Sequence, residues 1–346
     1  MPITGVDISD ESVHIAELEN TPEGKKIKKF DKRLIPKGLI EDGYIKDAKK
    51  IKAFFTKLRR DHNLHFVNVS LPEQHGYVVV VRIPKVQPDE IYNNLELQIE
   101  EHVPIPVNEA TFAYDIIRGG DPNDDLAFIE LNVTVYPREI VEEYMDVFLG
   151  TGLVPLRFEV ESHAVSRTVV PEDDDGTFMV LDFGKTRTGI TIVNNGVVQF
   201  TSTIGIGGDM ITRAVARNFS ISFEEAERLK TEKGFLVGEG DENMLLALMP
   251  TVSALKDEVG KHYQYWNNHD DVFGKKRQKI DTLLLCGGLA NFKGLPEYLA
   301  SNIHTNVRVA NIFGNINSFE NYIPSISFEK SLQYATSIGL ALSSSR

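Results

Sequence analysis

The stretch MVLDFGKTRTGITIV, residues 179–193, contains the pattern that decides the fold. It reads as an apolar strand ending in Asp182, a tight glycine turn and a second alternating strand. A strand that delivers one carboxylate into a turn of glycine and hydroxyl groups is typical of a fold that presents a metal-bound phosphate. A weaker copy, ITGVDISDESVHIAEL at residues 3–18, has Asp7 in the position of Asp182. Two such strand–turn–strand units predict two similar domains that face one ligand.

The composition limits the class of protein. With 346 residues, of which 42% are apolar, the chain is long enough for two domains with separate cores. The net charge is -13, and the short basic runs at 25–29 and 275–279 are expected to be solvated loops, so nucleic acid is not an expected partner. A single cysteine, Cys286, fits a reducing cytoplasm. No run reaches the roughly 18 apolar residues of a membrane span, which predicts a cytoplasmic protein that meets a membrane only through a partner.

The first half of the chain predicts an α/β domain with an insertion. Alternation and capping signals indicate strands at 3–8, 13–18 and 66–71 and a helix over 47–61 behind an Asp47 cap. The next stretch predicts a small α+β subdomain, with strands at 77–83, 111–117 and 127–135 and helices at 88–102 and 137–149.

The second half of the chain predicts a further α/β domain beyond the linker candidate PEDDDG, residues 171–176. Gly207 and Gly208 precede an amphipathic helix, where free amide groups can meet an anion. Ser222 and Glu225 fit a capping box. The further expected helices cover 222–233, 242–266, 295–303 and 332–342. The apolar stripe of the helix over 242–266 is interpreted as packing.

An ordered set of motifs carries a family resemblance: VDISDES, VESHAVSR, LDFGKTRT, EEAERLK, CGGLANFKGL and YATSIGLAL. This order resembles the actin-like ATPase superfamily, with its two phosphate motifs, two connecting helices and adenosine motif. Within it the chain is most similar to the PilM family of type IV pilus assembly proteins, through IPKVQPDEIYNNLELQIEEHVPIP, the VES start of the first connecting helix and the final IGLAL. It is similar more distantly to the cell-division protein FtsA.

The resemblance implies an α/β, actin-like (ASKHA, ribonuclease H-like) two-domain fold, with a nucleotide cleft between the domains and an inserted subdomain. The expected subdomains are IA at 1–83, completed by 155–176 and 325–346; IC, the insertion, at 84–154; IIA at 177–205 and 280–324; and IIB at 206–279.

The resemblance also implies a site for ATP or ADP with Mg²⁺. Asp7 and Asp182 would organise the metal, mostly through water, and Glu161 would position the attacking water. The remaining implied contacts are Ser9, Ser12, Gly184, Lys185, Thr186, Gly207 and Gly208 at the phosphates, Glu224, Glu227 and Lys230 by the ribose and base, and Gly287, Gly288, Leu289 and Phe292 on the adenine side.

One departure from the family pattern concerns the first phosphate turn. Relatives usually have glycine where this chain has Ser9, and Asp10 and Glu11 add negative charge beside it. This favours nucleotide binding over efficient hydrolysis, at most a weak Mg-dependent ATPase activity. It also predicts that the second turn, with Asp182, dominates phosphate binding.

Structural interpretations stay open for several of these residues. Asp7 and Asp182 can cap hairpin turns, and Glu161 is favourable in the first turn of a helix without any function. Glu224, Glu227 and Lys230 can form an exposed helical face.

The implied function is an ATP-binding scaffold of the type IV pilus machine at the inner face of the cytoplasmic membrane. The implied partner is the N-terminal cytoplasmic peptide of a PilN-like membrane protein, received in a groove of the first domain near IC. Pilus motor ATPases and self-association are further candidate contacts. One alternative is an FtsA-like filament-forming ATPase, for whose C-terminal membrane helix residues 343–346 leave no room. The other is a sugar kinase, which needs a substrate pocket with a catalytic carboxylate.

Overall fold

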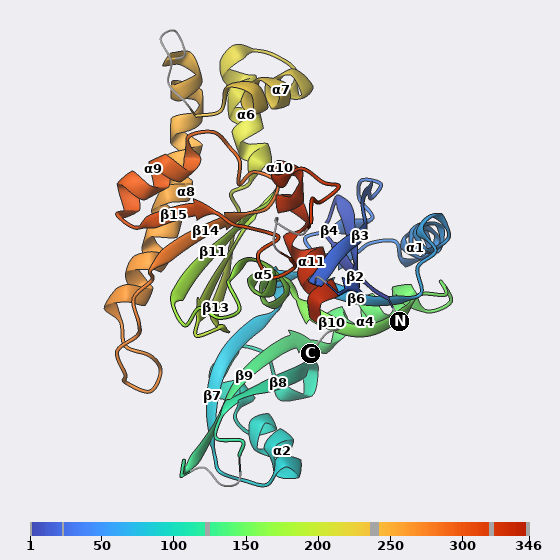
Figure 1. Ribbon diagram of the computed structural model, residues 1–346, viewed down its shortest axis with the longest axis vertical. Helices are drawn as coiled ribbons and strands as arrows, with labels where there is room; N and C mark the ends of the chain where they lie inside the picture. Colours follow the sequence, from blue (N-terminus) through green and yellow to red (C-terminus); the bar gives the residue numbers. More distant parts are fainter. Residues whose placement is uncertain (1, 23, 122–124, 236–241, 318–321, 344–346) are drawn as a thin grey trace.

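Two five-stranded sheets of the same topology form the body of the molecule (Figure 1). The computed structural model describes residues 2–22, 24–121, 125–235, 242–317 and 322–343. The first sheet has the order β10-β6-β1-β2-β3, in which β1 pairs antiparallel with β2 and parallel with β6. Its strands are β1 (Ile3–Ile8), β2 (Ser12–Thr21), β3 (Gly24–Leu34), β6 (Phe66–Leu71) and β10 (Val154–Val160).

The second sheet repeats this arrangement in the order β13-β12-β11-β14-β15. Its strands are β11 (Thr177–Phe183), β12 (Thr188–Asn194), β13 (Val197–Ile204), β14 (Thr282–Cys286) and β15 (Asn306–Val309). β11 pairs antiparallel with β12 and parallel with β14, as β1 does with β2 and β6. β1 and β11 are therefore equivalent strands, and the predicted two-domain α/β fold is confirmed.

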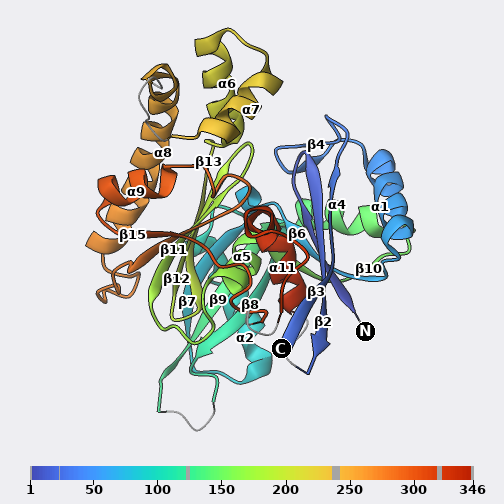
Figure 2. The same ribbon diagram turned by 45° about the horizontal axis from the view of Figure 1, so that its top comes forward.

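Two helices, α5 (Glu161–Val169) and α11 (Ala335–Leu342), lie between the sheets (Figures 1 and 2). They pack on each other, α11 also packs on β1, and α5 packs on β12. A Cβ on Gly339 would lie 1.8 Å from the carbonyl oxygen of Ala164, and a Cβ on Gly5 would lie 1.8 Å from that of Ser337. Only glycine permits these close crossings.

The C-terminal helix is shorter than expected. The prediction of one helix over 332–342 is wrong at its start, because α10 (Phe328–Ser331) and a 3₁₀ turn, Leu332–Tyr334, precede α11.

A three-stranded sheet of order β7-β9-β8 forms the inserted subdomain, at the lower end of Figure 1. Its elements are β7 (Tyr77–Pro84), β8 (Ala110–Arg118), β9 (Phe128–Pro137), α2 (Ile91–Glu96), α3 (Ile99–His102) and the 3₁₀ turns Pro88–Glu90 and Val107–Glu109. It has its own apolar core, which includes Leu95, Leu131 and Val133. β7 begins before residue 84, and the subdomain boundaries stay a prediction.

The expected continuous helix over 88–102 is wrong. Ile91, Leu95 and Ile99 are buried as predicted, but α2 ends at Glu96. The backbone N–H of Gln98 donates to the carbonyl of Leu95, three residues back, at 2.9 Å. This 3₁₀-type bond replaces the α-helical ladder and divides the helix.

The outer helices of the first domain are α1 (Ala48–His62) and α4 (Arg138–Phe148), and a short hairpin, β4 (Ile40–Glu41) and β5 (Tyr44–Ile45), lies beside them. The Asp47 side chain accepts from the Lys50 N–H at 3.0 Å, as the predicted cap requires. The rings of Phe55 and Phe148 are 4.8 Å apart. Although α4 lies within 84–154, its buried side chains belong to the large core cluster that joins both five-stranded sheets, so the expectation of a separate core for each domain is wrong.

The helices of the second domain are α6 (Gly208–Phe219), α7 (Phe223–Lys233), α8 (Glu242–Asn268) and α9 (Leu295–Ile303). The capping box of Ser222 and Glu225 is confirmed at the start of α7. Val252, Leu255 and Val259 of α8 are buried, as the interpretation of its stripe as packing predicts. None of the helices that the structure describes is long and apolar enough to cross a membrane.

The expectation that residues 25–29 form a solvated loop is wrong. They lie in β3, where Ile27 is buried and the amines of Lys28 and Lys29 lie 3.0 and 3.5 Å from the Glu17 carboxylate. A strand places alternate residues on opposite faces, so one apolar residue among lysines still contributes to the core.

Candidate functional site

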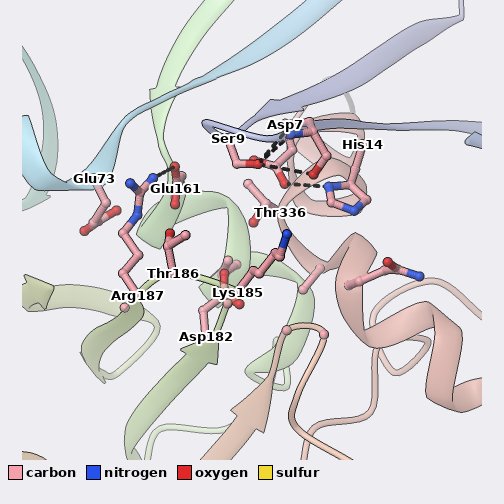
Figure 3. Close-up of a pocket in the computed structure, with 18 of the residues that line it drawn as sticks. Asp7, Ser9, His14, Glu73, Glu161, Asp182, Lys185, Thr186, Arg187 and Thr336 are labelled. Atoms are coloured by element: carbon pink, nitrogen blue, oxygen red, sulfur yellow. Dashed lines mark hydrogen bonds and ion pairs between the residues drawn. The ribbon is translucent and has the colours of Figure 1, made fainter. Parts of the chain in front are cut away.

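A cleft of about 350 Å³ lies where β1 and β11 end (Figure 3). Asp7 on β1 and Asp182 on β11 both line it, and the structure brings them together with most of the predicted phosphate contacts. The predicted residues that line the cleft are Asp7, Ser9, Ser12, Glu161, Asp182, Gly184, Lys185, Thr186, Gly287 and Gly288. Its volume is within the range of ordinary ligand pockets.

Asp7 is held by neighbours on the first sheet. The Ser70 hydroxyl at the end of β6 donates to Asp7 Oδ1 at 3.1 Å, and Nδ1 of His14 lies 3.5 Å from Oδ2. His14 is opposite Asp7 in the β1–β2 register. The carboxylate is therefore fixed at the cleft edge of the strand.

Asp182 is packed against the end of β14. Gly287 has φ of +85°, and a Cβ there would lie 2.4 Å from Asp182 Oδ1, so this approach requires glycine. Burial, and then the charge of Asp7, raise the pKa of Asp182 from 3.8 to about 7. Each carboxylate disfavours ionisation of the other, so a cation bound between them would stabilise the ionised form of both.

The turn after β11 is a compact loop built on glycine. The Gly184 N–H donates to the Arg187 carbonyl at 3.0 Å, and a Cβ on Gly207 would lie 2.5 Å from the carbonyl carbon of Thr186. Gly207 therefore packs directly against the backbone of the turn, and Gly208 packs against the Leu289 side chain. Neither Gly207 nor Gly208 lines the cleft.

Lys185 forms an ion pair across the cleft with Glu11, and its amine lies 4.0 Å from Asp209. The Lys185 side chain remains 57% exposed. Because both partners are carboxylates, an anionic ligand such as a phosphate can replace them at the Lys185 amine.

The first turn is ordered despite lacking the family glycine. The Ser9 N–H and hydroxyl donate to the Ser12 carbonyl at 2.9 and 3.0 Å. Asp10 accepts the backbone N–H groups of Asp42 and Gly43 at 3.1 and 2.9 Å. One of the two extra acids is thus structural, whereas Glu11 faces Lys185.

Glu161 is the first residue of α5 and lies beside two charged groups that the sequence did not predict. Arg187 Nη2 is 3.6 Å from Glu161 Oε1. Figure 3 shows Arg187 between Glu161 and Glu73. Burial raises the pKa of Glu161, and Arg187 opposes this effect. Burial also raises the pKa of Glu73, whose Oε2 accepts the Ser162 N–H at 2.9 Å.

Of the predicted ribose and adenine residues, Gly287 and Gly288 line the cleft, whereas the other five lie outside its lining. Lys230 is buried and donates to Glu227 at 2.8 Å and to Thr212 at 3.0 Å, whereas Glu224 is exposed on α7. Phe292 is 5% exposed and belongs to the core. Leu289 contacts Gly208. Their roles at a nucleotide stay a prediction.

Sequence reasoning missed Arg187, Glu73, Lys32 and His14, which all line the cleft. Desolvation and the charge of Lys185 lower the pKa of Lys32. Arg187 lies inside the stretch that decides the fold, three residues after Gly184, so its proximity to the turn was a usable signal. Lys32 and Glu73 had no such signal, because only the fold brings their strand and turn to the cleft.

The lining fits a polyphosphate with Mg²⁺. Lys32, Lys185 and Arg187 supply positive charge, and the exposed Gly288 has open space where a Cβ would stand. Among the described residues no group of three or more His, Cys, Asp or Glu side chains could hold a metal by itself. Asp7 and Asp182 therefore suit Mg²⁺ that takes its other ligands from phosphate and water.

Two domains of one topology, with an Asp-bearing hairpin from each in a shared cleft, define an actin-like protein. The chain belongs to the type IV pilus assembly protein PilM family, whose model matches residues 5–345. The solved structure of a PilM-PilN type IV pilus biogenesis complex superposes with a TM-score of 0.81 at 19% identity, covering 99% of this chain and 98% of that chain.

More distant relatives show the same fold. The structure of MreB5 of Spiroplasma citri bound to ADP gives a TM-score of 0.55 at 13% identity, covering 91% of this chain and 93% of that chain. The cell division protein FtsA of Agrobacterium fabrum (strain C58) is 25% identical over an alignment of 162 residues that covers 39% of this chain and 34% of FtsA. The match thus spans about a third of the length of this curated relative. The resemblance to the PilM family and the actin-like superfamily is confirmed.

Proposed function

We propose that this protein binds Mg-ATP or Mg-ADP in the cleft and acts as a scaffold of the type IV pilus assembly machine. The observation that carries the nucleotide part is the convergence of Asp7, Asp182 and Lys185 in one cleft, from strands that are equivalent in the two domains. Bound Mg²⁺ would neutralise phosphate charge between the two carboxylates. Lys185 would exchange Glu11 for phosphate, and Ser9 and Thr186 would offer hydroxyl groups to phosphate oxygens.

Hydrolysis would be slow or absent. The first turn carries Ser9 where relatives usually have glycine, and it bears the Glu11 carboxylate, where negative charge opposes phosphate. Nucleotide would then stabilise a conformation rather than drive rapid turnover.

Calorimetry tests the nucleotide part. We expect the purified protein to bind Mg-ATP or Mg-ADP and Asp182→Ala to weaken that binding by at least tenfold. Ser202→Ala, a hydroxyl change on β13 outside the cleft lining, serves as control and should bind like the wild type. Absence of binding to the wild-type protein would refute this part.

We further propose that a second cavity, of about 760 Å³, receives the N-terminal cytoplasmic peptide of a PilN-like membrane protein. The cavity lies where β8, β10, α5 and the turn after β12 meet, which is beside the inserted subdomain. The Asn132 side chain of β9 donates to the Val198 carbonyl at 2.6 Å and ties the inserted sheet to the second domain there. The PilM-PilN structure supports the choice of partner.

The lining of this cavity suits an extended peptide with polar side chains. β8 is an edge strand of its sheet, and Asp115 and Ile116 on it line the cavity. A peptide can therefore add to the sheet by backbone hydrogen bonds. Arg157 and His163 face the same cavity and would select the peptide's charge. Through this peptide the protein would reach the inner face of the cytoplasmic membrane.

A pull-down from membranes, with mass-spectrometric identification, tests the partner. We expect the wild-type protein to retain a bitopic pilus protein and Ile116→Asp to lose it. Leu246→Asp is the matched control, because Leu246 is also exposed but lies on α8 outside the cavity. Retention by Ile116→Asp equal to that by Leu246→Asp would contradict the assignment of the cavity.

A further inference from the structure

The guanidinium group of Arg187 lacks the hydrogen bonds that hold two similarly buried arginines, Arg82 and Arg167, to their carboxylates. Its side chain is 20% exposed and its ion pair with Glu161, at 3.6 Å, is longer than a hydrogen bond. Within the described residues, the Arg187 side chain makes no hydrogen bond to another group. A guanidinium has five N–H donors in a planar fork. These donors are available to a ligand in the cleft.

Arg167 provides the internal comparison. It hydrogen-bonds both carboxylate oxygens of Glu159 and donates to the Gly339 carbonyl at 2.7 Å. That arrangement is what a structural arginine is expected to form. Arg187 also has a carboxylate within reach, that of Glu161, but forms only the longer contact with it. We read this as a side chain that is not positioned to pair with Glu161.

Arg187 also lies at the closed end of the cleft. Figure 3 shows Arg187 beside Glu73, which accepts the Ser162 N–H, and Glu73 and Ser162 are 7% and 3% exposed. Lys185, whose side chain is 57% exposed, and the exposed Gly288 belong to the part of the lining that is open to solvent. The Ser162 hydroxyl and Oε1 of Glu73 have no hydrogen-bond partner among the described residues. The closed end is therefore polar, buried and incompletely satisfied.

A nucleotide that enters with its base at the open end would place its last phosphate deepest. We propose that Arg187 binds the terminal phosphate of a nucleoside triphosphate and so distinguishes ATP from ADP, an inference that rests on the proposed nucleotide site. On binding, the guanidinium exchanges its long contact with Glu161 for paired hydrogen bonds to phosphate oxygens. A diphosphate ends short of Arg187 and leaves the Arg187–Glu161 pair intact.

This exchange gives the two nucleotides different effects on Glu161. With a diphosphate, Glu161 keeps its cation. With a triphosphate, Glu161 loses that partner and faces the cleft. Arg187 is thus a specificity-determining residue that reports the state of the nucleotide to the first turn of α5.

Calorimetric titrations with Mg-ADP and with Mg²⁺ and the non-hydrolysable ATP analogue AMPPNP test the inference. A charge-assisted contact predicts that Arg187→Gln weakens AMPPNP binding about tenfold or more and changes ADP affinity less than twofold. Arg187→Lys, which keeps the charge but loses the fork, should fall between the two for AMPPNP. Equal losses for both nucleotides, or no loss for AMPPNP, would overturn the proposal.

Glu161→Gln provides a second test on a different residue, and stands alone if Arg187→Gln does not fold. Removing the Glu161 charge releases Arg187, so AMPPNP should bind about threefold or more tightly while ADP binding changes little. Unchanged or weaker AMPPNP binding would count against the exchange. If wild-type protein bound neither nucleotide, the proposed function itself would fail, whereas a failure of this inference alone leaves wild-type binding intact.

Discussion

Asp182 is the residue whose ionisation is most directly tied to the architecture of the cleft. It is half-buried at the end of β11, opposite Asp7, and its pKa is raised from 3.8 to about 7. The folded state therefore keeps this proton up to about pH 7, whereas the unfolded chain releases it near pH 3.8. The contribution of Asp182 to stability falls as the pH rises through that interval.

This fall in stability with rising pH leads to a prediction for Asp182→Asn in buffer without nucleotide or divalent cations. At pH 8 the variant should melt a few degrees above the wild type, because it has no buried charge to ionise. At pH 5 the difference should be less than half as large, because only the first part of the interval between pH 3.8 and about 7 has been crossed. Thermal unfolding followed by circular dichroism at both pH values gives the comparison. A difference of the same size at both pH values would contradict the assigned ionisation.

The two aspartates are expected to be unequal toward ATP. Asp182 belongs to the turn that keeps its glycine, whereas the turn after Asp7 carries Ser9 and the Glu11 carboxylate. Calorimetry should therefore show a larger loss of Mg-ATP affinity for Asp182→Ala than for Asp7→Ala, by about fivefold. Equal losses would count against a dominant second turn.

The residue scale also shows what the sequence could predict. Asp7 and Asp182 were predicted to face one ligand because each follows a strand and precedes a turn, and both do line the cleft. Arg187 was missed although it lies in the same stretch, because the direction of its side chain depends on how the loop between Gly184 and Thr188 folds. Phe292 was predicted to reach the ligand, but it is buried in the core.

At the scale of elements, the contact of α11 with α5 couples the chain's C-terminal helix to the cleft. Gly339→Ala would place a methyl group 1.8 Å from the Ala164 carbonyl oxygen. We expect a loss of unfolding free energy of about 3 kcal/mol, because the methyl group would meet the backbone of α5, which cannot move away without disturbing the packing of the two helices. Chemical denaturation measures the change.

Gly260→Ala on α8 is the matched control, since a Cβ there meets nothing within 4 Å. Alanine in a helix interior should add about 0.5–1 kcal/mol of stability. If Gly339→Ala were as stable as Gly260→Ala, the close crossing would not exist as described.

Prediction of helices and strands from the sequence succeeded where local signals were strong. It failed where pairing with a distant segment determines the secondary structure. The Asp47 cap and the Ser222 capping box fixed the starts of two helices. Residues 25–29 were misread because Ile27 is their only apolar residue, and pairing of β3 with β2 supplies the rest of the stabilisation. The division of the helix over 88–102 depends on a local change of hydrogen bonding that apolar spacing does not show.

At the scale of the whole molecule, the actin-like fold alone does not separate a scaffold from a filament. FtsA, a curated relative, matches 39% of this chain, and the PilM-family model matches residues 5–345. We therefore expect the protein to stay in the supernatant on high-speed centrifugation with Mg-ATP and without its peptide. Sedimentation that depends on ATP would favour the filament-forming alternative.

The central claim is that a metal-bound nucleotide lies between the two domains, with its metal between Asp7 and Asp182. Crystals grown with ADP and Mn²⁺ in place of Mg²⁺ test this directly, because Mn²⁺ gives an anomalous signal. We predict one anomalous peak between the two carboxylates, next to the diphosphate. A nucleotide bound elsewhere, or a peak remote from both aspartates, would contradict the account.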